Sequence, residues 1–298
     1  MQMFSMKKWA LFAVICLFSF GALCQGNQSV LWKISGKNLT KPSYLFGTIH
    51  IVSYKYLDYF PQLKQIIENA DRGCFEGTSD SERKIDPNLA KVSFPPLDSV
   101  FTTEEYALVD SFFSKTPYGS IKEHNHDASL LGMLQAAHLI KENSDDVPQM
   151  SLDEKIIEYM QEDLKKPVFQ LDDPNIVMKQ VLSYGSPSSI ATELVNYIKD
   201  SRTSNIDSAL NVRLYQSSLT HKLRINEKIP SDNADLLMVF KDAGKRNSLW
   251  VPEIIDQMQK GSCFIAVGMG HLQYTTGLIA LLKKKGYKLT PVKLDRVQ

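Results

Sequence analysis

Two histidines near opposite ends of the chain follow the same short pattern. His50 ends the segment SYLFGTIH over residues 43–50, and His271 ends SCFIAVGMGH over residues 262–271. An apolar run of this length is typical of a strand that is covered on both faces. The glycine after each run allows the chain to turn sharply. We therefore expect both imidazoles at one edge of a sheet, where open α/β sheets bind their ligands.

Glu76 is the third residue of this predicted site. It ends a short apolar segment over residues 73–76, which follows a helical pattern over residues 54–70. The order strand, helix, strand implies a right-handed crossover and parallel pairing, which would bring Glu76 to the edge that carries His50.

Two imidazoles and one carboxylate are a common ligand set for a catalytic divalent metal. The pattern predicts that His50, Glu76 and His271 hold such an ion (manganese, cobalt or zinc), which lowers the pKa of a bound water for attack on a carbonyl carbon. Spacing alone leaves open whether Glu76 is a ligand or a general base.

The glycines of the two turns, Gly47, Gly268 and Gly270, complete this part of the prediction. Glycine lets the backbone come close to whatever is bound beside it. We therefore predict that all three contact the substrate.

Arg246 is a further candidate, in the segment KRNSLW over residues 245–250. Its guanidinium could bind a substrate carboxylate or stabilise an oxyanion, although the spacing alone favours a surface arginine. If the preceding helix packs through Leu237 and Phe240, Arg246 would lean into the cleft and lower the pKa of Glu76. Trp250 would then anchor the following turn.

The elements that position these residues follow from the apolar periodicity. Further strands are predicted at residues 30–35 (as an edge strand), 167–172, 263–267 and 287–293, and further helices at residues 128–140, 188–200, 205–223, 234–260 and 272–285. Capping boxes at Thr102–Glu105 and Ser151–Glu154 begin two more helices. We predict one α/β domain over residues 25–298, with a mixed, largely parallel sheet made of two βαβ-type halves and a helical insertion between them.

The first 24 residues are predicted to be a secretory signal. Lys7 and Lys8 precede an apolar core over residues 9–20, and small residues follow. The core is too short to span a membrane comfortably, and no second apolar span follows. We expect an exported mature chain, periplasmic or extracellular, that begins at Gln25. In the alternative interpretation, Cys24 is acylated and anchors the protein to lipid.

Charge and cysteines narrow the function further. The chain has 34 basic and 33 acidic residues and no dense basic stripe, which argues against a nucleic-acid partner. Without the signal, only Cys74 and Cys263 remain, and neither has a C-x-x-C partner, which excludes a structural zinc knuckle. We expect free core thiols rather than a cross-strand disulfide.

A second histidine cluster competes for the metal. His124 and His126 lie in the segment EHNHD over residues 123–127. These residue types are ordinary at a helix start, so we assign them no metal. His138 and His221 are predicted to be structural. No G-x-S-x-G, P-loop or dinucleotide motif is present.

The motifs together resemble the TraB/PrgY/GumN family, which belongs to the Tiki-like superfamily with ChaN and erythromycin-esterase-type proteins. The resemblance covers residues 30–292 and rests on LWKI at 31–34, YLFGTIH at 44–50, CFE at 74–76, RNxxW at 246–250 and FIAVGMGHL at 264–272. It implies a duplicated α/β fold and, from the Tiki proteins, metal-dependent peptidase activity. It also implies that His50, Glu76 and His271 are metal or catalytic residues, with Arg246 a site residue and Asn247 near the substrate.

Two positions depart from the family pattern. Tyr274 stands where the family tends to carry glycine, and Asp172 stands where it carries glutamate. We expect Tyr274 to narrow the pocket near His271 and contact the substrate, and the shorter Asp172 to reach less far.

These observations lead to one main function and one alternative. The main hypothesis is a secreted metal-dependent hydrolase that acts on the amide or ester bonds of a peptide or small molecule. The alternative is a non-catalytic extracytoplasmic protein that binds a peptide or small ligand at the same edge, in a pheromone-shutdown or polysaccharide-related role. Nothing in the pattern specifies the oligomeric state.

Overall fold

The computed structural model describes residues 29–297 except 51, 78–85, 87, 89–94, 117, 126–129, 143–149, 184, 201–214, 216–217 and 232–233; the side chains of residues 135, 139, 142, 180–183 and 234–239 are also outside the description. The predicted signal over residues 1–24 and most of the helix predicted over residues 205–223 therefore lie outside the described residues.

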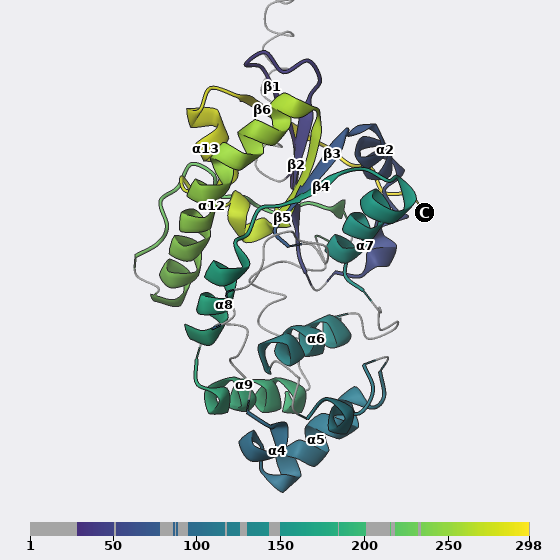
Figure 1. Cartoon of the computed structure of the whole chain (residues 1–298), viewed down its shortest axis with the longest axis vertical. Helices are drawn as coiled ribbons and strands as arrows, with labels where there is room; N and C mark the ends of the chain where they lie inside the picture. The colour runs from purple at the N-terminus through teal and green to yellow at the C-terminus, as the bar shows by residue number, and fades with distance from the viewer. Residues whose placement is uncertain are drawn as a thin grey trace, which may run out of the picture.

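Six strands of the described residues form one sheet in the order β4-β3-β5-β2-β1-β6 (Figure 1). Their bounds are β1 Leu31–Ser35, β2 Ser43–Thr48, β3 Arg72–Phe75, β4 Val168–Gln170, β5 Cys263–Gly268 and β6 Lys288–Val292. β5 pairs in parallel with β2 and with β3, and β3 pairs in parallel with β4. β1 is antiparallel to both β2 and β6, so among the described strands it alone runs against the others. The predicted mixed, largely parallel sheet is confirmed.

The position of β1 differs from the prediction. It lies between β2 and β6 rather than at an edge of the sheet. Leu31 and Trp32 point to opposite faces and both are buried, so only Lys33 marks the strand as polar. The prediction was wrong because one exposed residue imitates the alternation of a half-buried strand.

The direction of the crossovers sets which face each helix covers. β2 leads through α2 (Pro61–Asn69) to β3, which lies toward the β4 edge of the sheet. β5 leads through α13 (Leu278–Lys284) to β6, which forms the opposite edge. Because such crossovers are right-handed, opposite directions place the helices on opposite faces. In Figure 1, α2 and α7 (Leu152–Glu158) lie on one side of the sheet, and α12 (Ala234–Lys260) and α13 on the other. A crevice is expected where β2 and β5 send the chain to opposite faces.

A second hydrophobic core lies outside the sheet. Buried side chains such as Leu97, Val109, Leu134 and Leu194 form it, separately from the core around the sheet. Figure 1 shows the helices that carry them gathered at one end of the molecule. These helices are α4 Leu97–Val100, α5 Thr103–Phe113, α6 Leu130–Glu142 and α9 Pro187–Lys199; η2 Ile121–His124, η3 Tyr159–Asp163 and α8 Pro174–Ser183 complete the middle of the chain.

The predicted helical insertion is thus present, although β4 divides it. Both predicted capping boxes are formed. Thr102 caps α5 and Ser151 caps α7, each with the glutamate three residues later bonded back to the capping residue. Reciprocal bonds of this kind satisfy backbone donors that the first turn of a helix leaves unpaired.

The predicted helix over residues 54–70 has different bounds. A 3-10 turn, η1 (Tyr54–Leu57), comes first, and α2 begins at Pro61. Proline has no N–H to donate to a preceding turn, so it starts a helix more readily than it continues one.

The predicted helix over residues 272–285 also starts later. A 3-10 turn, η4 (Met269–Leu272), follows β5, and the helix begins only at Leu278. Tyr274 interrupts the pattern with a left-handed backbone (φ 63°). α12, in contrast, continues through Trp250 despite Pro252, so Trp250 lies inside a helix and does not anchor a turn.

Cys74 and Cys263 are both buried and free, as predicted. A hydrogen bond with Cys263, together with burial, raises the pKa of the Cys74 thiol, so it stays protonated and unreactive. Within the described residues, no helix combines the length and apolar character needed to cross a membrane.

Candidate functional site

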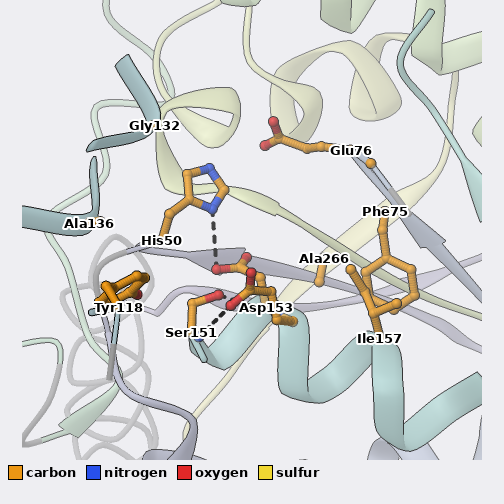
Figure 2. Close-up of a pocket in the computed structure, with 12 residues that line it drawn as sticks. His50, Phe75, Glu76, Tyr118, Gly132, Ala136, Ser151, Asp153, Ile157 and Ala266 are labelled. Atoms are coloured by element: carbon orange, nitrogen blue, oxygen red, sulfur yellow. Dashed lines mark hydrogen bonds and ion pairs between the residues drawn. The ribbon is translucent and has the colours of Figure 1, made fainter. Parts of the chain in front are cut away.

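The carboxyl ends of β2, β3 and β5 bring the predicted site residues together at one edge of the sheet. Glu76 Oε1 lies 3.7 Å from Nε2 of His271. A Cβ placed on Gly268 would be 3.0 Å from Glu76 Oε1 and 3.0 Å from Nε2 of His50. A cleft of about 460 Å³ opens here, and Figure 2 shows His50 and Glu76 facing each other across it.

Asn247 fixes the orientation of His271. Nδ2 of Asn247 donates to the carbonyl oxygens of His271 (3.2 Å) and Thr276 (2.9 Å), so its Oδ1 has to face the ring. His271 therefore donates from Nδ1 to this oxygen at 2.7 Å, and its Nε2 carries a lone pair toward Glu76. Burial lowers the pKa of His271 to about 4, although Glu76 opposes the shift. The ring is neutral at pH 7.

Asp153 fixes the orientation of His50. Its carboxylate lies 3.2 Å from Nδ1 of His50, and a carboxylate can only accept, so Nδ1 carries the proton (Figure 2). The His50 side chain is 55% exposed. The charge of Asp153 and its hydrogen bond raise the pKa of His50 to about 10. Metal binding at Nε2 must therefore displace a proton, so we expect the metal affinity to decrease as the pH is lowered.

Arg246 joins Glu76 to a second carboxylate, Asp172. Its Nη2 donates to Oε2 of Glu76 at 2.8 Å and to Oδ2 of Asp172 at 2.5 Å, and its Nε donates to Oδ1 of Asp172 at 3.0 Å. Asp172 also accepts from the indole N–H of Trp250 at 3.2 Å. The Trp250 ring lies between two site residues, 4.8 Å from the Arg246 guanidinium and 4.3 Å from the His271 ring.

This network keeps Glu76 ionised. Burial by itself raises the pKa of a carboxyl group. The charge of His271, present once its ring is protonated at low pH, acts with the charges of His50 and Arg246 and the backbone N–H of Gly268 to outweigh burial and lower the pKa of Glu76 from 4.5 to about 2. Arg246 thus lies where it can position Glu76, although it is not among the residues that line the cleft.

The two imidazoles fit a divalent metal. Each has its Nδ1 held by an acceptor oxygen and its Nε2 turned toward Glu76, which is how metal-binding histidines are usually oriented. The 3.7 Å between Nε2 of His271 and Oε1 of Glu76 is near the roughly 3.4 Å that separates two ligand atoms about 2.1 Å from a tetrahedral zinc ion.

The described side chains do not form a closed metal site. In the part of the chain that the structure describes, no group of three or more His, Cys, Asp or Glu side chains is arranged to hold an ion. Glu76 accounts for this, because Arg246 occupies Oε2 and the Gly268 N–H occupies Oε1. A metal would have to compete with these donors for the carboxylate.

The residues predicted to contact substrate fall into two groups. Gly268 lies in the site, where any Cβ would crowd His50 and Glu76. Gly47 instead packs on the other face, where a Cβ would be 2.9 Å from Leu272. The structure gives packing as the reason for glycine at this position and offers no support for substrate contact.

Three further predicted contacts also lie away from the cleft lining. Asn247 is buried and holds His271. Tyr274 is buried with its ring 4.7 Å from that of Phe240, and a Cβ on Gly270 would meet the same ring at 3.7 Å. Asp172 reaches Arg246 despite its shorter side chain.

Several residues of the cleft were not predicted from the sequence. Asp153 follows the recognised Ser151 cap, but no local pattern links it to His50, which lies 103 residues away. Tyr118, Gly132 and Ala136 line the cleft from the helical insertion. Only the packing of the insertion against the sheet reveals them.

The competing cluster is divided. His124 ends the 3-10 turn η2, and the Asn125 side chain accepts from the N–H of Asp98. His126 and Asp127 lie outside the described residues. His138 stacks on Tyr197 with ring centres 3.9 Å apart, and His221 is buried.

Thr48 provides a test of the site's packing. Its side chain is on the same face of the sheet as its register partner Gly268, the residue is 1% exposed, and its hydroxyl has no hydrogen-bond partner in the described structure. A buried unpaired hydroxyl is destabilising. We expect Thr48→Val to raise the free energy of unfolding of the metal-free protein by about 1 kcal/mol in urea denaturation.

Thr102→Val is the matched control. Thr102 accepts a bond from the N–H of Glu105 as the cap of α5, so its loss should cost about 1 kcal/mol. A loss of similar size in Thr48→Val would show that the Thr48 hydroxyl has a partner.

Comparison with known proteins supports the resemblance noted in the sequence. The model of the TraB/PrgY/gumN family matches residues 30–291. No curated protein and no solved structure gives a significant match.

Proposed function

The chain belongs to the TraB/PrgY/gumN family, and from this premise we propose that it is a metal-dependent hydrolase of amide or ester bonds in a peptide or small molecule. The observation that carries the proposal is the matched orientation of His50 and His271. Both have Nδ1 engaged by an acceptor, and both leave Nε2 facing Glu76. Two such rings beside an ionised carboxylate are the donor set of a catalytic metal.

The residues have separate tasks in this proposal. His50, His271 and Glu76 would hold the divalent ion, which when bound supplies an activated water at neutral pH. Asn247 and Asp153 keep the two Nδ1 protons in place. Each of these three residues is itself held by a neighbour, so binding the ion would require His50 to lose its Nε2 proton and Glu76 to exchange one of its donors for the ion.

Arg246 positions Glu76 in the same proposal. Its Nη2 bridges Glu76 and Asp172, and the indole ring of Trp250 packs against its guanidinium. A planar guanidinium is suited to hold two carboxylates at once. We assign it to keeping Glu76 ionised and oriented.

Export is a separate part of the proposal. It is supported by the charged start and apolar core of residues 1–24. The intact mass of protein recovered outside the cytoplasm tests it: a mature chain beginning at Gln25 is expected, and an acylated Cys24 would contradict it.

Metal content tests the site directly. We expect about one equivalent of manganese, cobalt or zinc in the wild type by elemental analysis, and less in His50→Ala and His271→Ala. Asp153→Asn should weaken the metal affinity about 10- to 100-fold, because it removes the charge that holds His50. His124→Ala, an exposed histidine away from the cleft, is the control. Metal content in His50→Ala and His271→Ala equal to that of the wild type and of the control would contradict the site.

Glu76→Gln separates the two roles that remain for Glu76. As a ligand, its loss should lower both metal content and turnover of a peptide library. As a general base, its loss should lower turnover while the metal stays.

A second function is favoured by one observation. Because Arg246 and the Gly268 N–H already engage Glu76, the cleft could bind a peptide or small ligand without a metal. Tight ligand binding with neither metal nor turnover would favour this binding protein over the hydrolase.

A further inference from the structure

The cleft beside the histidines has one charged end and one apolar side. Its charged lining residues are His50, Glu76, Asp153 and Glu154. The Asp153 carboxylate faces His50, and the Glu154 carboxylate accepts from the backbone N–H of Ser151 at 2.6 Å. These groups already have partners in the protein, so they offer little to a cationic substrate side chain.

The rest of the lining is largely apolar. Phe75 and Ala266 come from neighbouring strands, and Ile157 comes from α7. In Figure 2 these three lie together below Glu76, while Tyr118, Gly132 and Ala136 lie on the side of His50. A bound side chain would therefore meet hydrocarbon on both sides.

α6 makes room on the second of these sides. Gly132 and Ala136 are four residues apart and so lie one above the other on one face of the helix. Leu134 and Ile140 of the same helix are buried in the helical core instead. The two α6 residues that line the cleft, Gly132 and Ala136, have no side-chain atoms beyond Cβ.

From this arrangement, and resting on the proposed hydrolase, we infer that the cleft contains a subsite for a bulky aliphatic or aromatic side chain of a peptide substrate. The subsite consists of Gly132 and Ala136 on one side and Phe75 and Ile157 on the other. Burial of such a side chain is favourable at roughly 25 cal/mol per Å² of apolar surface, and a glycine or a charged residue would gain nothing comparable.

Ala136→Leu tests the subsite by filling it. The probes are the tripeptide amides Ala-Leu-Ala and Ala-Gly-Ala, assayed for cleavage and, by calorimetry, for binding to manganese-loaded protein. The wild type should prefer the leucine peptide by about 10- to 200-fold in kcat/KM. Ala136→Leu should remove most of that preference through KM, with metal content unchanged.

Ala107→Leu is the matched control. Ala107 is an exposed alanine of α5 and does not line the cleft, so the same substitution there should change neither peptide preference nor metal content.

Each outcome bears on a different part of the inference. Cleavage or binding that does not distinguish the two peptides, or a preference that survives Ala136→Leu, overturns the subsite. Binding of the leucine peptide that depends on Ala136, without cleavage by the wild type, supports the subsite and rejects the hydrolase.

Discussion

Arg246→Ala is expected to lower the free energy of unfolding by about 3–5 kcal/mol. The substitution leaves two carboxylates without their cation, since Arg246 bonds both Glu76 and Asp172. The side chains of the three residues are between 9% and 19% exposed, so water replaces the lost bonds poorly. Removing one partner from a buried ion pair costs more than the pair itself contributes.

Urea denaturation measures this loss of stability, and three further variants serve for comparison with Arg246→Ala. Arg246→Lys keeps the charge but cannot contact both carboxylates with a planar fork, so we expect an intermediate loss of stability. Lys245→Ala, whose side chain is 76% exposed, should be nearly neutral. Glu162→Ala removes one partner of an exposed ion pair, so it should lower the free energy of unfolding much less than Arg246→Ala does.

Turnover should fall as well. Arg246→Lys removes the planar group that orients Glu76. If Glu76 acts in the proposed reaction, the folded variant should have a kcat that is lower by roughly 10²- to 10³-fold. Metal content should persist. If a folded Arg246 variant kept the turnover of the wild type, the role of Arg246 would be purely structural.

The second large effect is on the pH dependence of stability. Glu76 has a pKa of about 2 in the folded protein, against an ordinary 4.5. A carboxyl group with a lowered pKa stabilises the fold fully above its unfolded pKa, and this contribution is lost as pH falls through the folded pKa. We therefore expect the metal-free protein to lose on the order of 3 kcal/mol from Glu76 between about pH 4.5 and pH 2.

His271 extends this acid-sensitive range upward. Burial lowers its pKa from 6.5 to about 4. Because the unfolded chain binds the proton more readily, stability declines as pH falls from about 6.5 toward 4. The two groups together predict a continuous loss of stability below pH 6.5.

Glu76→Gln tests the carboxyl part. In urea denaturation of metal-free protein between pH 3 and pH 7, this variant should show a flatter profile below pH 4.5 than the wild type. Glu162→Gln should follow the wild type. Parallel profiles for Glu76→Gln and the wild type would show that Glu76 does not titrate abnormally.

Much of the sheet and the place of the site could be predicted from local patterns. The runs before His50, Glu76 and His271 are short, apolar and ended by glycine or a polar residue, which is sufficient to identify strands and their carboxyl ends. Right-handed crossovers then require parallel directions, so the polar residues after those strands lie at one edge. The structure brings these residues together there.

The order of the strands was decided only by the tertiary structure. β5 inserts between β2 and β3, and this places Gly268 against Glu76 and His50. Strand pairing joins residues far apart in the chain, and the apolar pattern of a buried strand is the same whichever neighbours it has. The internal position of β1 was predicted wrongly because the exposed Lys33 imitates the alternation of an edge strand.

The groups that hold the site residues were also decided by the tertiary structure. Asp153 and His50 are 103 residues apart, and Asp172 and Arg246 are 74 residues apart. A local pattern shows that a residue is polar, but not which distant group it will meet. By itself, the sequence determined the chemistry available at this edge of the sheet; the packing of α7, α12 and the insertion determined which nitrogen of each histidine faces Glu76, because those contacts hold the other nitrogen.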